Sequence, residues 1–337
     1  MTGALPAISV AMSVYNGEVH LAAAIESVLS QSFGDFEFLI LDDGSADTSR
    51  SIAEGYAARD PRIRLIRREN RGLVTSLNEL FGAARAPLVA RFDADDLCAP
   101  ERFASQTAFL ADHPGHGLVG CDTPYIDGAG QPSGNPPITR PHDHAGLCAN
   151  LEDGPLICHS AVMVRRELVL AAGGYRPAYT HAEDYDLWLR LAGLTKLANL
   201  PKPLLYYRIT PGQVSTRHMV EQARNAAIAW LAHRERLAGR SDPTEGMAQL
   251  PAIDALDPLF GPGSASFVRR RVVNRTLYSP EALAGAGWEI LLAYAAEART
   301  DPRMWRSAAR LMRGGRLLHA ARLAVTLAGI SGAGMAA

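Results

Sequence analysis

The sequence lacks an excess of one charge, closely paired cysteines and any long uninterrupted apolar stretch. Its 337 residues include 34 Lys or Arg and 35 Asp or Glu, so the formal net charge is −1. Because it has neither a basic domain nor a nucleic-acid reading motif, we do not expect the chain to bind nucleic acid. The four cysteines include no C-x-x-C pair, which argues against a zinc knuckle or a redox motif.

The absence of a window of about 18 apolar residues predicts that no helix spans a membrane. The nearest candidate, residues 317–330, is interrupted by His319 and Arg322. Residues 1–6 contain no basic stretch followed by an apolar run, so we expect no signal peptide. These absences predict a cytoplasmic protein.

Short apolar runs alternate with segments of helical periodicity in the first half of the chain. Strands are predicted at residues 8–14, 36–41, 63–66, 88–92 and 157–164. Helices are predicted at residues 21–29, 45–56 and 73–81, with Ser45 as the N-cap of the second. The alternation predicts an α/β fold whose mostly parallel sheet has helices on both faces. In such sheets, ligands bind at the carboxyl ends of the strands.

The later part of the chain changes character. Residues 131–141 have the composition of a loop, and from about Met219 onward the pattern is wholly helical. A turn around Pro211 and Gly212 marks the expected boundary. We therefore predict an α/β domain at residues 1–216 and a helical region at residues 217–337.

Three groups of carboxylates stand out, and two of them directly follow predicted strands. They are Asp42–Asp43, Asp93–Asp96 with alanine at position 94, and Glu183–Asp184. Clustered carboxylates repel one another unless a cation or several donors compensate. An Asp-x-Asp pair at a strand end suits Mg²⁺ or Mn²⁺, which also binds phosphate oxygens. Aspartates also end strands and cap helices, so neither short string alone establishes a metal site.

The ordered combination of these motifs resembles the family 2 glycosyltransferases with the GT-A fold. The resemblance covers about residues 6–210. Its matching segments are residues 8–16, 27–33, 41–45, 70–73 with Asn78, 91–96, 159–163, 173–175 and 182–188. It implies that residues 1–216 are a GT-A nucleotide-sugar-binding catalytic domain, followed by a C-terminal helical region. The implied reaction moves a sugar from a nucleotide sugar to an acceptor hydroxyl.

The resemblance also implies roles for individual residues. Ser13 and Tyr15 would lie where the family holds the nucleoside, and Arg71 would contact the base or a phosphate. Asp42 would accept a hydrogen bond from the base, and Asp93 would lie near the ribose. Asp95 would bind the Mn²⁺ or Mg²⁺ ion that bridges the diphosphate. Asp184 would be the base of an inverting transfer, with Glu183 orienting the acceptor or that base.

Departures from the family pattern narrow the reaction. Processive members carry a Gln-x-x-Arg-Trp motif, whereas Gln213 is followed here by Arg217 at the wrong spacing and by no tryptophan. A single transfer is therefore expected. The pattern around Asp42 favours a UDP-sugar as the donor, and the acceptor would be a glycan or a lipid-linked molecule. Polysaccharide or glycolipid synthesis would be the setting. His181 or His218 could complete the metal site, although a lone histidine is more often a packing or surface residue.

Other enzyme classes fit less well. A haloacid-dehalogenase-type phosphatase needs an aspartate nucleophile where this chain has Leu41, and a nucleotidyltransferase needs a glycine-rich basic loop near the first strand. A non-catalytic nucleotide-sugar-binding module stays open.

The tail at residues 301–330 has a basic helical face and an apolar one. The basic residues are Arg303, Arg306, Arg310 and Arg313, and the apolar residues are Met304, Ala308, Leu311 and Leu318. Such a segment favours peripheral contact with the inner face of a membrane, or packing of its apolar face on the domain.

Overall fold

The computed structural model describes residues 5–136, 139–210 and 217–329. The chain divides into two compact units. The first comprises Met1–Ala178 and Glu183–Gln213, and the second comprises Tyr179–Ala182 and Val214–Ala337. The expected boundary at Pro211 and Gly212 lies outside the described residues, as does Gln213, where the sequence departs from the processive motif.

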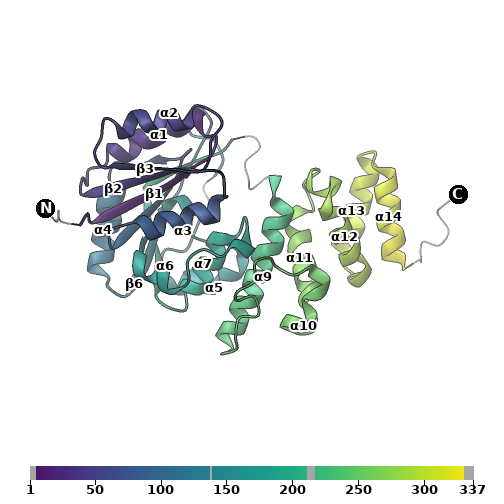
Figure 1. The fold of residues 1–337 in the computed structure, drawn as a ribbon. Helices are drawn as coiled ribbons and strands as arrows, with labels where there is room; N and C mark the ends of the chain where they lie inside the picture. The colour runs from purple at the N-terminus through teal and green to yellow at the C-terminus, as the bar shows by residue number, and fades with distance from the viewer. Residues whose placement is uncertain (1–4, 137–138, 211–216, 330–337) are drawn as a thin grey trace. The chain divides into compact units, whose positions relative to one another are not determined.

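The first unit is built on a seven-stranded sheet in the order β3-β2-β1-β4-β8-β6-β9 (Figure 1). Its strands are β1 (Ile8–Val14), β2 (Phe36–Asp42), β3 (Ile63–Arg67), β4 (Leu88–Asp93), β6 (His116–Asp122), β8 (Met163–Arg165) and β9 (Lys196–Pro203). Strand β8 runs antiparallel to both neighbours, whereas every other pairing in the sheet is parallel. A smaller sheet joins β5 (Leu97–Cys98), β10 (Leu205–Arg208) and β7 (Tyr125–Ile126), with β10 in the middle.

Helices cover both faces of the large sheet, as the alternating pattern predicts. They are α1 (Glu18–Leu29), α2 (Ser49–Ala57), α3 (Leu73–Ala83), α4 (Arg102–Asp112), α5 (His144–Ala149), α6 (Arg166–Ala171) and α7 (Glu183–Leu191). Val10 and Met12 of β1 share one apolar core with α1, while Ala11 between them faces a second core with α3 and α7. Strand side chains alternate between faces, so the continuous apolar run of β1 supplies both cores.

Two local predictions are wrong. Helix α2 begins at Ser49 rather than after Ser45. The side chain of Ser45 instead accepts a hydrogen bond from the main-chain N–H of Asn16, and so it ties two loops together. The strand expected at residues 157–164 is reduced to β8, because residues 159–161 form a 3-10 turn. The described part of the 131–141 loop contains no helix or strand, as its composition predicts.

The second unit is helical, as the pattern after Met219 predicts. Its helices are α9 (Met219–Leu237), α10 (Asp257–Phe260), α11 (Ser264–Thr276), α12 (Ala286–Glu297), α13 (Pro302–Arg313) and α14 (Leu317–Ala328), coloured green to yellow in Figure 1. Helices α11 to α14 share an apolar core that includes Trp288, Leu291 and Leu323. Among the described residues, no helix combines the length and apolarity needed to cross a bilayer.

The described part of the 301–330 segment, residues 301–329, contains two helices, α13 and α14, joined by a turn at Gly314 and Gly315. Met304, Ala308 and Leu311 are buried, as the apolar face requires, but Leu318 is 79% exposed. The expectation for Leu318 is wrong because the turn at Gly314 and Gly315 resets the helical phase between the two helices.

Candidate active site

The acidic groups at the ends of β2 and β4 meet at one edge of the sheet, because both strands lie beside β1. Asp42 is in register with Val14, and Asp93 is in register with Ser13. All three strands run in the same direction, so their carboxyl ends share one edge. Ser13 is the penultimate residue of β1, between the two acidic groups, and Tyr15 lies just beyond the strand and is 55% exposed. The sequence-based placement of these groups at one sheet edge agrees with the structure.

The adjacent aspartates at the end of β2, Asp42 and Asp43, accept hydrogen bonds from two different loops. Asp42 is fully buried, and its carboxylate accepts hydrogen bonds from Arg50 Nε at 2.7 Å and from the main-chain N–H of Ser45 at 3.1 Å. Asp43 accepts from the main-chain N–H groups of Arg71 at 3.0 Å and Gly72 at 2.9 Å. Asp43 therefore shapes the turn that presents the exposed side chain of Arg71.

An open pocket of ≈ 530 Å³ lies beside these aspartates. It is lined by Gly44, Arg50, Arg67, Arg68, Glu69 and Asn70. Gly44 has φ 79°, and a Cβ there would lie 2.6 Å from the main-chain nitrogen of Asn70. Only glycine fits this close approach without displacing the pocket wall. Three arginines make the lining favourable for a phosphate or another anionic group.

Asp93, Asp95 and Asp96 form a carboxylate cluster whose candidate ligand oxygens all lie within 4.8 Å of one another. Arg91, two residues earlier on the same face of β4, pairs with the Asp93 carboxylate and is itself 3% exposed. The Oγ of Ser160 accepts the main-chain N–H of Asp93 at 3.0 Å. Arg91 pairs directly with one of the three carboxylates, which leaves an excess of negative charge in the cluster.

That excess changes the proton affinity of the cluster. Burial, and then the charge of Asp93, raises the pKa of Asp95 to about 6. Burial and the charges of Asp93 and Asp95 raise the pKa of Asp96 well above its usual value. Oδ2 of Asp96 is buried and accepts no hydrogen bond. An orphaned carboxylate oxygen among repelling neighbours is the arrangement that a divalent cation relieves.

Arg208 of β10 holds the loop that carries Asp95 and Asp96. Its main-chain N–H donates to Oδ1 of Asp96 at 2.8 Å, and its Nε donates to the carbonyl of Asp95 at 2.6 Å. Its Nη1 reaches the carbonyls of Asp127 and Gly128. Arg208 is 3% exposed, so these bonds form away from solvent. The acidic loop is therefore fixed by a residue far along the chain.

Asp184 and Glu183 begin α7 in the same unit. Glu183 is 7% exposed, whereas Asp184 is partly exposed and its Oδ1 accepts the N–H of Tyr185 at 2.7 Å. Burial raises the pKa of Asp184 to about 6. The charges of Arg91 and Asp93 act on the same carboxyl in opposite directions, which relates Asp184 to the carboxylate cluster. A carboxylate with this pKa is suited to accept a proton near neutral pH.

Sequence reasoning missed the residues that support the acidic loop. Arg91 had a usable signal, because an i, i+2 pair on a strand places Arg91 and Asp93 on one face. Ser160 lies in the matching segment 159–163 and Arg208 within the range of the resemblance, but the sequence did not indicate their partners, which lie 67 and 112 residues away.

Comparison with known proteins identifies glycosyltransferases as relatives of this chain. A model of glycosyl transferase family 2 matches residues 9–171. The putative glycosyltransferase EpsE of Bacillus subtilis is 38% identical over 191 residues, 55% of this chain and 66% of EpsE, so just under two thirds of EpsE is spanned. The amylovoran biosynthesis glycosyltransferase AmsE of Erwinia amylovora is 31% identical over 219 residues, 62% of this chain and 79% of AmsE.

Solved structures share the fold at low sequence identity. TarS 1–349 of S. aureus in complex with UDP-GlcNAc has a TM-score of 0.58 and 15% identity, covering 96% of this chain and 90% of that one. The mannosyltransferase PcManGT from Pyrobaculum calidifontis, in complex with GDP-Man and Mn²⁺, has a TM-score of 0.51 and 19% identity, with 97% and 87% covered. These likenesses confirm the GT-A fold. With the family match and AmsE, they show that this chain belongs to glycosyl transferase family 2.

Proposed function

We propose that the chain transfers a single sugar, with inversion, from a nucleoside diphosphate sugar to an acceptor hydroxyl. The observation that carries this proposal is the carboxylate cluster of Asp93, Asp95 and Asp96, with Asp184 under the influence of its charges. The cluster has the donor set for a metal–diphosphate, and Asp184 has the pKa of a base. The reaction requires stabilisation of the negative charge that develops on the leaving group and removal of a proton from the acceptor hydroxyl. The cluster would serve the first requirement and Asp184 the second.

A divalent cation, Mn²⁺ or Mg²⁺, fits the cluster because all of its candidate ligands are hard oxygens. Asp95 would be the main ligand, with Asp96 Oδ2 free of competing hydrogen bonds and Asp93 beside them. When bound, such an ion stabilises the negative charge that develops on a departing diphosphate. Burial, and then repulsion from Asp93, raises the pKa of Asp95, and a bound cation would offset both by stabilising the ionised carboxylate.

The chain's own residues would do the remaining work. Asp184 would hold the acceptor hydroxyl and take its proton at a carboxylate oxygen as that hydroxyl attacks the anomeric carbon. Attack on the face opposite the leaving group inverts the anomeric centre. Glu183, largely buried next to Asp184, would orient the acceptor or the base. A positioned base typically contributes about 10²- to 10⁴-fold to such a step.

The nucleoside would lie between the ends of β1 and β2, against Ser13, Tyr15 and Arg71. Asp42 would accept the base N–H, but no part of Asp42 is exposed and Arg50 covers it at 2.7 Å. Arg50 is 44% exposed, so its side chain can swing toward a phosphate and uncover Asp42. We favour a UDP-sugar, and the UDP-GlcNAc complex of TarS supports that choice by fold alone.

The acceptor would be a glycan or a lipid-linked glycan in polysaccharide or glycolipid synthesis, which the description of AmsE supports. Contact with the inner face of a membrane would bring the chain to such acceptors. The turn between α13 and α14 carries exposed apolar residues beside exposed arginines. They are Met312, Leu317 and Leu318, with Arg313 and Arg316. Apolar side chains flanked by cations suit an anionic lipid surface.

Donor turnover tests the proposed function. The full chain would be incubated with Mn²⁺, a panel of UDP- and GDP-sugars and simple glycosides, and released nucleotide and product would be measured. We expect nucleoside diphosphate and a product of inverted configuration from one donor. Asp184→Asn should retain donor binding and lose transfer, whereas the surface change Asp112→Asn should alter neither. In a parallel incubation with UTP or GTP and a sugar 1-phosphate, release of pyrophosphate from the triphosphate would favour a nucleotidyltransferase, and donor binding without any turnover would favour a binding module.

A further inference from the structure

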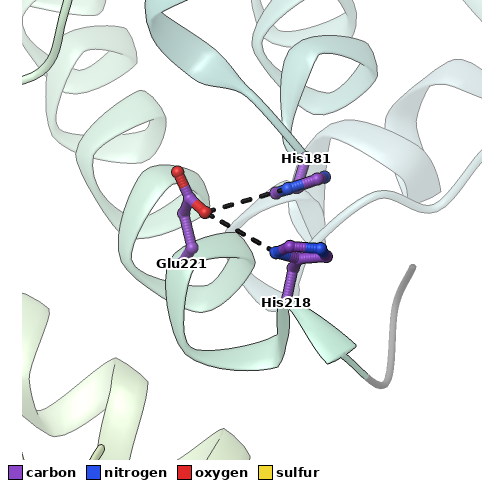
Figure 2. Close-up of side chains that lie close together, drawn as sticks. All are labelled: His181, His218 and Glu221. Carbon is purple, nitrogen blue, oxygen red and sulfur yellow. Dashed lines mark ion pairs between the residues drawn. The ribbon is translucent and has the colours of Figure 1, made fainter. Parts of the chain in front are cut away.

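A second group of potential metal ligands lies within the helical unit. His181 belongs to the segment Tyr179–Ala182, His218 immediately precedes α9, and Glu221 lies in the first turn of α9. Figure 2 shows the two imidazole rings stacked, with the Glu221 carboxylate directed toward both. The ring centroids are 4.1 Å apart, and one nitrogen from each ring and one carboxylate oxygen lie within 4.8 Å of one another.

The spacing of these atoms does not fit hydrogen bonds. Oε2 of Glu221 is 3.7 Å from Nε2 of His181 and 3.9 Å from Nδ1 of His218. Both distances exceed the range of an N–H···O hydrogen bond, which ends near 3.2 Å. Two ligands of a tetrahedral ion at bond lengths of about 2.1 Å lie about 3.4 Å apart. The two oxygen–nitrogen separations therefore need to contract by a few tenths of an ångström, and the stacked rings need to turn so that one ion lies in the plane of each imidazole.

The main chain at His181 has an uncommon conformation, and hydrogen bonds from α9 hold it there. His181 has φ 65°, which is unusual for a residue other than glycine and is found where neighbouring structure enforces it. Two side chains of α9 supply that enforcement: Gln222 donates to the carbonyl of His181 at 3.1 Å, and Asn225 donates to the carbonyl of Thr180 at 2.8 Å. The His181 ring is thus presented to the first turn of α9 before any ion binds.

Exposure leaves room for a fourth ligand. The side chain of His181 is 20% exposed, that of His218 is 45% exposed, and that of Glu221 is 50% exposed. Water or a small anion can complete the coordination from the solvent side.

We propose that His181, His218 and Glu221 form a site for a divalent transition-metal ion of the Zn²⁺ class, separate from the carboxylate cluster of the first unit. Two imidazoles and one carboxylate are a donor set typical of Zn²⁺ with one position open, whereas Mg²⁺ prefers oxygen alone. The ion would clip residue 181 to residues 218 and 221. The chain between these ligands contains Glu183 and Asp184, so the clip limits the freedom of the segment that carries the proposed base.

Metal binding to the full chain tests this site without any assay of glycosyl transfer. After removal of metals with a chelator, Zn²⁺ affinity would be measured by equilibrium dialysis, and Co²⁺ would be added to record its visible absorption. His181→Asn, His218→Ala and Glu221→Gln each remove one ligand, and asparagine is chosen because it tolerates positive φ. Each variant should lose at least about tenfold in Zn²⁺ affinity and lose the absorption of four-coordinate Co²⁺.

Three control variants distinguish this site from nonspecific metal binding and from binding at the carboxylate cluster. His319→Gln and Glu245→Gln remove a histidine and a carboxylate elsewhere in the same unit, and both should bind Zn²⁺ as the wild type does. Asp95→Asn should leave Zn²⁺ affinity and the Co²⁺ spectrum unchanged. The proposal is overturned if the three ligand variants bind like the wild type, or if Asp95→Asn weakens binding as much as they do. Because donor turnover is not measured, failure here leaves the proposed function untouched.

Discussion

The main-chain N–H of Arg208 donates to Oδ1 of Asp96 at 2.8 Å, across 112 residues of sequence. The same residue holds the carbonyl of Asp95 through its guanidinium group. Two contacts from one buried residue fix both the side chain and the main chain of the acidic loop. This relationship makes the geometry of the proposed metal site depend on strand β10 of the small sheet.

Arg208→Met should therefore destabilise the protein and weaken donor binding together. It removes buried hydrogen bonds to several carbonyls, and we expect a loss of about 2 to 4 kcal/mol in the free energy of unfolding. Arg240→Met is the matched control, because the side chain of Arg240 is 61% exposed in its ion pair with Glu235. Surface pairs contribute little to stability. Urea unfolding of both variants checks the difference, and equal losses would show that the Arg208 contacts add no special stability.

Transfer should weaken in acid. The pKa of Asp184 is raised by burial to about 6, so below that pH its carboxyl carries a proton and cannot accept another. We expect kcat/KM to be level above this value and to fall about tenfold per pH unit below it. Because the pKa of Asp95 is also about 6, donor affinity should be measured at each pH to separate metal loss from base protonation. A rate that stays level well below pH 6 would exclude Asp184 as the base.

Asp95→Asn should stabilise the metal-free protein at neutral pH. Folding raises the pKa of Asp95 from 3.8 to about 6, so the folded wild type loses stability as the pH rises through that interval. The variant has no such proton to lose. In a chelating buffer, its free energy of unfolding should exceed that of the wild type by about 1 to 3 kcal/mol above pH 6. The gain should vanish near pH 4 in urea unfolding curves, and a gain independent of pH would argue against a strained Asp95.

Membrane contact should depend on the turn between α13 and α14. Replacing Leu317 and Leu318 by serine should reduce sedimentation with vesicles that contain anionic lipid by at least about threefold, because burial of each leucine in the interface contributes on the order of 1 kcal/mol. Leu237→Ser is the control, since Leu237 is 69% exposed at the end of α9. Equal sedimentation of all variants, or sedimentation that is unaffected by high salt, would contradict a basic, apolar contact with lipid.

The sequence predicts the sheet edge well and the supporting contacts poorly, for physical reasons. Apolar runs such as that of β1 are long enough to specify a buried strand, and alternation with helices predicts a mostly parallel sheet. The prediction for the start of α2 is wrong because the Ser45 hydroxyl accepts a hydrogen bond from the main-chain N–H of Asn16 in a neighbouring loop, instead of capping a helix. Strand β8 is short because the turn at residues 159–161 interrupts an apolar run that has no sequence signal for a turn.

In the candidate site, the aspartates at the ends of β2 and β4 can be found in the sequence because they follow apolar runs. They lie at one edge of the sheet because both strands pair in parallel with β1. The pKa values of Asp95 and Asp96 are raised by burial and by the neighbouring aspartate charges, whereas Arg91, Ser160 and Arg208, which tertiary structure brings in, act to lower them. The grouping of His181 with His218 and Glu221 also arises from tertiary structure, because α7, β9 and β10 lie between His181 and α9 in the sequence. No local pattern encodes such a meeting.

Calorimetric titration of UDP tests the metal–diphosphate site most directly. The wild type, Asp95→Asn and Asp184→Asn would each be titrated with UDP in the presence of Mn²⁺ and in the presence of a chelator. We expect tight binding by the wild type only with Mn²⁺, the same binding by Asp184→Asn, and at least about tenfold weaker binding by Asp95→Asn. Equal UDP affinity of the wild type and Asp95→Asn in Mn²⁺ would contradict the assignment of the metal to the carboxylate cluster.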